Sequence, residues 1–114
     1  MQDIELVKQI ASLHLDFRKI LDEHIADFDE VLPYVYFGHL SDYFMANSKS
    51  PVVKQLFKLL EIHFKNGDEE IQTLIAVGVL ESLAADASDD AYAHIASLMG
   101  EGLREELHIY GRDF

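Results

Sequence analysis

The stretch GDEEIQTLIAVGVLESL, residues 67–83, decides the fold of this 114-residue chain. The three acidic residues at its beginning favour a helix start, because carboxylates there meet the positive end of the helix dipole. Apolar residues then follow at positions 71, 74, 75, 76, 77, 79, 80 and 83. They are too many for one face of a surface helix, so neighbouring elements must cover this helix on most sides. Gly78 weakens a helix interior, and its presence predicts that another backbone approaches closely. We therefore expect this segment to form the central helix.

The rest of the chain also follows the 3.6-residue period of helices, and no stretch alternates apolar and polar residues as a strand does. Start and stop signals such as Ser50-Pro51 and Asn66-Gly67 place the boundaries. The other predicted helices cover residues 3–24, 33–46, 51–65, 91–99 and 103–110. We expect these helices to form one all-α domain over residues 1–114. The short links between them make neighbouring helices antiparallel. Its predicted architecture is a compact bundle of five to six antiparallel helices, arranged as helical hairpins around the buried central helix.

Composition excludes several classes of protein. The longest apolar run, Leu74 to Leu80, is interrupted by Gly78 and is far shorter than the ~20 residues of a membrane span. Residues 1–25 lack a basic start followed by an apolar block, so we expect no secretory signal and a cytoplasmic location. The absence of cysteine excludes a disulfide framework, a thiolate zinc site and a cysteine nucleophile.

Residues that could carry metal or catalytic chemistry are present but not in the required spacings. The six histidines include no pair at i and i+4, and the chain lacks the repeated Glu-x-x-His pairs of di-iron bundles. Gly100-Glu101-Gly102 follows no strand and has an acid at its centre, which would repel phosphate. We therefore expect no metal, no cofactor and no enzymatic activity.

The aromatic segment YVYFGHLSDYF, residues 34–44, allows two interpretations. Rings at helical spacing are most often core, which we predict for Val35, Phe37 and Phe44. Three tyrosines in ten residues, however, exceed what a small core easily satisfies through their hydroxyls, and tyrosine is enriched in protein interfaces. The candidates for contact with a partner are Tyr34, Tyr36 and Tyr43.

Negative charge is concentrated in two segments that contain no lysine or arginine. The formal net charge is −12, yet residues 20–48 alone hold 6 acids and residues 66–103 hold 8. A merely soluble domain usually intersperses both signs. Such a surface repels nucleic acid and anionic lipid and attracts basic proteins. The predicted binding residues are Asp22, Glu23, Asp27, Asp29, Glu30, Tyr34, Tyr36 and Asp42, and secondarily Asp86, Asp89 and Asp90.

The segment GDEEIQTLIAVGVLESL, followed by LMGEGLREEL at residues 98–107, resembles a family of small helical bacterial proteins found beside polymorphic and contact-dependent toxins. In that family a Gly-Asp-Glu-Glu start precedes a Leu-Ile-x-Val helix, and a Leu-Gly-x-x-Leu-Arg-x-x-Leu segment follows. The similarity covers residues 60–107, and the front half is similar only in pattern. The chain departs at Thr73, where asparagine is usual, and at Gly78-Val79, where Ser-Phe is usual. The fold that the resemblance implies is expected despite these departures.

The resemblance implies an immunity protein, which binds the C-terminal domain of a cognate toxin and blocks its active site or its access to substrate. The charge pattern agrees with this role independently, because an acidic protein can mimic the phosphate backbone that a basic nuclease binds. The alternative is a helical adaptor or regulatory subunit that oligomerises or docks a partner other than a toxin. Self-association is possible under either hypothesis.

Overall fold

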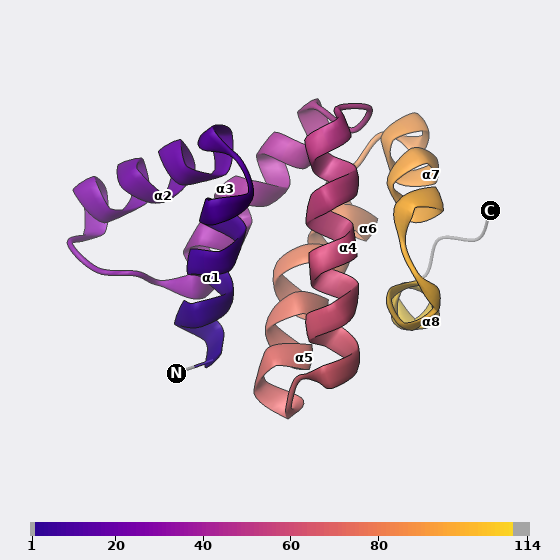
Figure 1. Cartoon of the computed structure of the whole chain (residues 1–114). Helices are drawn as coiled ribbons and strands as arrows, with labels where there is room; N and C mark the ends of the chain where they lie inside the picture. Colours follow the sequence, from indigo (N-terminus) through magenta and orange to yellow (C-terminus); the bar gives the residue numbers. More distant parts are fainter. Residues whose placement is uncertain (1, 111–114) are drawn as a thin grey trace.

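The predicted central helix is the element against which most of the others lie (Figure 1). In the computed structural model, which describes residues 2–110, α5 (Glu69–Ile75), the π-helix η1 (Ala76–Glu81) and α6 (Ser82–Asp86) follow one another without a break. Asp68 caps this helix, because its Oδ1 accepts a hydrogen bond from the backbone N–H of Ile71 at 3.0 Å. The buried residues are Ile71, Leu74, Ile75, Ala76, Gly78, Val79, Leu80 and Leu83. The helix is thus covered on most sides, as predicted.

Six further helices lie within residues 2–110. They are α1 (Gln2–Leu13), α2 (Leu15–Phe28), α3 (Pro33–Ala46), α4 (Pro51–Asn66), α7 (Asp89–Leu98) and α8 (Glu101–Ile109). α4 and α5 run side by side in opposite directions, α2 lies at one edge of the molecule beside α1 and α3, and α7 and α8 lie at the other edge against α4 (Figure 1). Every helix contributes to one cluster of buried apolar side chains, and the radius of gyration of 13.1 Å is that of a compact chain of this size.

The all-α prediction is confirmed: within residues 2–110 the structure is helical without strands, at 85% helix. The predicted count of five to six helices is not confirmed, since seven are seen when α5, η1 and α6 are counted as one. Met1 and residues 111–114, which the predicted domain includes, lie outside the described residues. No helix within the described part combines the length and hydropathy that crossing a membrane requires.

The additional helix arises because the predicted first helix is divided at His14. This residue has an extended backbone (φ −159°, ψ 149°), and its Nδ1 accepts a hydrogen bond from the N–H of Asp16 at 3.1 Å. The histidine side chain therefore caps α2 in the way that serine or aspartate usually does. No glycine or proline marks the break, so the sequence pattern gave no signal for it.

Gly78 lies where α3 approaches the central helix, as its position predicted. A Cβ atom at Gly78 would lie 3.0 Å from the Cβ of Phe37 on α3, closer than side chains normally allow. The buried hydroxyl of Ser41 lies 2.8 Å from the carbonyl of Phe37 and 3.0 Å from that of Gly78, so its one proton is shared between the two helices. This contact fixes the position of α3 relative to η1 and α6.

Glu61 joins α4 to the start of α8, a contact that the sequence pattern did not indicate. Its two carboxylate oxygens accept hydrogen bonds from the N–H groups of Gly102 and Leu103, each at 3.0 Å. A carboxylate from another helix thus satisfies two of the N–H groups that every helix start leaves free. A Cβ at Gly100 or Gly102 would come within 2.8 Å of this side chain, so the two glycines make room for the carboxylate.

Candidate protein-binding surface

The nine carboxylates predicted to bind a partner all lie at the surface. Asp22, Glu23 and Asp27 belong to α2, and Asp29 and Glu30 to the link that follows it. The others are Asp42 on α3, Asp86 at the end of α6, and Asp89 and Asp90 at the start of α7. Exposure leaves each of them able to contact a partner, and the question is which of them share a face.

The two predicted tyrosines separate into one surface and one core residue. Tyr34 is 52% exposed at the first turn of α3, whereas Tyr36 is fully buried. The hydroxyl of Tyr36 donates a hydrogen bond to the carbonyl of Phe17 at 3.2 Å, and burial raises the pKa of this phenol above its ordinary value. The prediction that Tyr36 contacts a partner is therefore wrong, because its ring fills the core and its hydroxyl has a partner within the fold.

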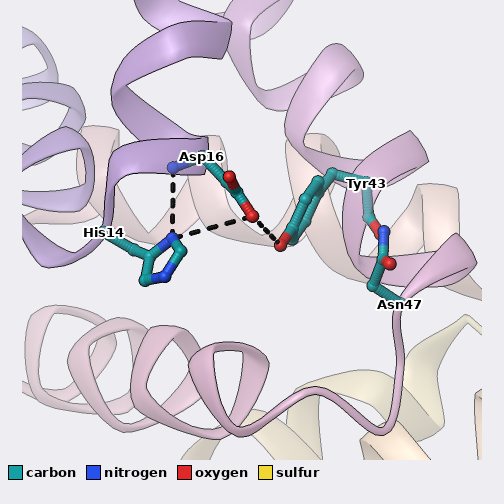
Figure 2. Close-up of polar contacts among 4 residues, drawn as sticks. All are labelled: His14, Asp16, Tyr43 and Asn47. Carbon is teal, nitrogen blue, oxygen red and sulfur yellow. Dashed lines mark hydrogen bonds and ion pairs between the residues drawn. The ribbon is translucent and has the colours of Figure 1, made fainter.

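Tyr43, the third candidate, is half-buried and joins α3 to the start of α2 (Figure 2). Its hydroxyl donates a hydrogen bond to Oδ2 of Asp16 at 2.7 Å. Burial together with this carboxylate raises the pKa of Tyr43 to about 12. Asp16 also lies 3.7 Å from Nδ1 of His14, and Asn47 donates its side-chain N–H to the carbonyl of Tyr43 at 2.9 Å. Tyr43 thus stabilises the divided α1–α2 geometry, and its hydroxyl is not available to a partner.

A groove of about 380 Å³ lies between α3 and α6 and brings together acids from both cation-free segments. Asp42 comes from the first segment and Asp86 from the second, 44 positions later in the sequence. Neither carboxylate forms an ion pair with another residue between 2 and 110. The residues lining the groove are Val35, Gly38, His39, Ser41, Asp42, Met45, Ser82 and Asp86.

A second hollow lies at the first turn of α3. It is lined by Tyr34 together with Asp68, Glu69, Glu70 and Thr73 from the start of α5. The Tyr34 ring therefore lies beside three exposed carboxylates, a combination that suits a cationic side chain through both charge and the face of the ring. These three acids belong to the second cation-free segment but are not among the predicted binding residues.

Hollow and groove lie along one face of α3, because Tyr34 lines the hollow and Gly38 and Asp42 line the groove. Tyr34, Gly38 and Asp42 succeed one another at four-residue intervals, so they lie on one face of the helix over about 12 Å. We call this strip the α3 surface. Its members are Tyr34, Val35, Gly38, His39, Asp42 and Met45 with Asp68, Glu69, Glu70, Thr73, Ser82 and Asp86. Val35, predicted to be core, is 36% exposed there, so that prediction is wrong.

Other predicted residues lie outside the α3 surface. Asp90 is paired with Lys49 at 3.5 Å, and Asp89 is its neighbour at the start of α7. Asp22 lines a separate groove between α1 and α2, together with Lys8 and Arg18. The acidic segments therefore converge only in part, and Asp42 with Asp86 is the pair that the structure brings together.

The end of α2 is held near the α3 surface by a buried histidine. His24 is 1% exposed, its Nε2 accepts a hydrogen bond from the N–H of Leu32 at 2.9 Å, and its ring lies 6.4 Å from that of His39. Burial lowers the pKa of His24, and the nearby His39 lowers it further while Asp27 opposes the shift. A neutral imidazole therefore fastens the link that carries Asp29 and Glu30.

The backbone of that link is set by Asp29, which has a left-handed conformation (φ 59°) and donates its N–H to the carbonyl of Ile25 at 2.7 Å. Aspartate tolerates this conformation better than most residues, and it ends α2 where glycine is usual. Phe28, 44% exposed, lies 5.0 Å from the His24 ring. The acidic link therefore has a defined shape and an aromatic neighbour at the surface.

Within residues 2–110, no group of three or more His, Asp or Glu side chains is arranged to hold a metal ion. The residues gathered along α3 are instead carboxylates, a tyrosine and small or flexible apolar residues.

Comparison with known proteins assigns the chain to a family. No curated protein and no solved structure matches the chain. The family described as "Domain of unknown function (DUF7674)" matches residues 5–113, which include the central helix and the whole α3 surface. The chain therefore belongs to the DUF7674 family.

Proposed function

We propose that this protein binds a basic partner protein through the α3 surface. The observation that supports this most strongly is the groove in which Asp42 and Asp86, drawn from the two cation-free segments, flank the outer face of α3. Asp68, Glu69 and Glu70, at the start of α5, add negative charge beside the exposed Tyr34 in the first turn of α3. Carboxylates gathered on one strip attract a basic protein from a distance and speed its association.

The partner that we propose is the C-terminal domain of a bacterial toxin, with this protein as its immunity protein in the cytoplasm. The support is the sequence resemblance of residues 60–107. The two arguments meet at the central helix, since its start supplies Asp68, Glu69 and Glu70 to the strip. In this role the protein acts by stoichiometric binding: its carboxylates occupy the basic surface on which the toxin would hold its substrate.

Coexpression tests this function. The domain encoded by the reading frame immediately upstream of this gene is expressed in a host cell with and without this protein. We expect growth arrest by the domain alone and restored growth when the protein is present, together with a stable complex whose affinity falls with salt. A domain that arrests growth equally in both strains, or that forms no complex with the purified protein, contradicts the proposal.

A second candidate function, a self-associating adaptor, is favoured by one observation. The groove between α1 and α2 holds Leu15, which is 60% exposed, and an edge on which Lys8 and Arg18 outnumber Asp22. The acidic end of α2 on a second copy would complement that edge in charge. Sedimentation of the purified chain tests this candidate, because such an adaptor forms oligomers without another protein, and a chain that stays monomeric at all concentrations contradicts it.

A further inference from the structure

Gly38 lies in the interior of α3 without a reason inside the fold. A Cβ added there meets no atom within 4 Å, and the backbone conformation is one that any residue adopts. Glycine weakens a helix interior more than any residue except proline. By contrast, a Cβ at Gly78, Gly100 or Gly102 would press against a neighbouring side chain. A local rule that is broken without an internal compensation is expected at functional positions.

The space above Gly38 belongs to the groove of the α3 surface. Val35 lies about one turn before it, Asp42 lies one turn after it, and Asp86 reaches the groove from α6. The volume of about 380 Å³ is at the small end of ligand pockets, which suits a single side chain. Its floor at Gly38 is bare backbone, so a guest can lie directly against the helix.

We propose that this groove receives the side chain of one arginine from the basic partner, with Gly38 as the residue that leaves room for it. The aliphatic stem lies over Gly38 and Val35, and the guanidinium meets the carboxylates of Asp42 and Asp86. Arginine suits this site because its planar head carries five donors and can serve two carboxylates at once, while its stem covers apolar surface. The inference rests on the proposed function, since it takes the partner to be a basic protein.

Substitutions at Gly38 test whether a larger side chain there stabilises the fold while it blocks the groove. Gly38→Ala is expected to raise the Tm of the free protein by roughly 4 °C, because a better helix former enters open space. Gly38→Leu fills the groove and is expected to leave the Tm at or above that of the parent protein. A lowered Tm in Gly38→Ala would show that the fold needs this glycine, and it would overturn the inference.

Binding is measured by NMR on the labelled protein with the peptide acetyl-Ala-Ala-Arg-Ala-Ala-amide. A peptide with citrulline in place of arginine has nearly the same shape without the charge. We expect the arginine peptide to shift the amide signals of Gly38, Asp42 and Asp86, and the citrulline peptide to leave them unchanged. Gly38→Leu is expected to lower the affinity for the arginine peptide by at least ~10-fold. The matched control Gln55→Leu, on the exposed face of α4, is expected to bind the peptide as tightly as the parent protein does.

Equal shifts with both peptides, or unchanged binding in Gly38→Leu, overturn the arginine site. Failure of the arginine site and failure of the proposed function give different results. If Gly38→Leu neutralises the upstream domain as well as the parent protein does, the arginine site is wrong and the function stands. If the peptide occupies the groove but the upstream domain neither binds nor arrests growth, the site stands and the function is wrong.

Discussion

Reversing the two carboxylates of the groove, in the double variant Asp42→Lys and Asp86→Lys, is expected to weaken binding of the basic partner by about 100-fold or more. Each substitution replaces an attraction with a repulsion on the same strip, and neither removes an ion pair within the described residues. The loss should be greatest at low salt and shrink as salt screens the charges. Titration calorimetry of the purified protein with the upstream domain, at two salt concentrations, measures both effects.

The matched control for this experiment is the double variant Glu5→Lys and Glu105→Lys. It changes the net charge by the same amount at two exposed helix positions outside the α3 surface. We expect it to lose little affinity beyond the general effect of net charge. Equal losses in the two variants would mean that the partner responds to total charge alone, and the assignment of the α3 surface would then be abandoned.

Removing the carboxylate that caps α8, in Glu61→Ala, is expected to lower the free energy of unfolding by about 2 kcal/mol. The side chain of Glu61 is only 15% exposed, and without it the N–H groups of Gly102 and Leu103 lose their acceptors. The neighbouring Lys65, 3.8 Å from the carboxylate and well exposed, adds little to this figure. Denaturant unfolding of the variant, beside Glu105→Ala as an exposed control, measures the difference.

A double-mutant cycle with Gly102→Ala makes this test specific to the cap. Alone, Gly102→Ala should destabilise the protein, because its Cβ would lie 2.7 Å from Oε2 of Glu61. In the Glu61→Ala background that clash is gone, and the better helix former should be neutral or stabilising. Destabilisation of the same size in both backgrounds would show that Gly102 has another role, and the account of the cap would fail.

Helix boundaries were predictable where local chemistry determines them. The predicted helix at residues 33–46 coincides with α3, and the one at 51–65 falls one residue short of α4. Proline at the first position and the Asn-Gly stop fix these ends without help from the rest of the fold. The break at His14 was not predictable in this way, because it depends on a histidine cap and on the Tyr43–Asp16 contact 27 residues apart.

Side-chain environments were less predictable than helices. A tyrosine in the core and a tyrosine at the surface look alike in sequence, so the pattern allows Tyr36 a place at the surface. In the structure Tyr36 is buried, and its hydroxyl donates a hydrogen bond to the carbonyl of Phe17. Glu61 caps the start of a helix 41 positions away, and no pattern in the sequence indicates this contact. The environments of Tyr36 and Glu61 both depend on contacts between distant segments, which periodicity does not report.

The candidate surface, too, was predictable only in part from the sequence. The cation-free segments could be read directly from the order of residues, and their carboxylates are exposed. Which of them meet depends on α3 lying beside η1 and α6, a packing fixed by Gly78 and Ser41. That packing selects Asp42 with Asp86 and adds Asp68, Glu69 and Glu70, while Asp89 and Asp90 lie at the start of another helix.

The most direct measurement is the footprint of the upstream domain on this protein, recorded as hydrogen exchange of backbone amides or as shifts of their NMR signals. Protection is predicted along α3 from Tyr34 to Met45, at residues 68–73 and at residues 82–86, with α7 and α8 unaffected. A footprint centred on α4, α7 or α8 instead, with the amides of α3 unchanged, would contradict the claim that these acids form the binding surface.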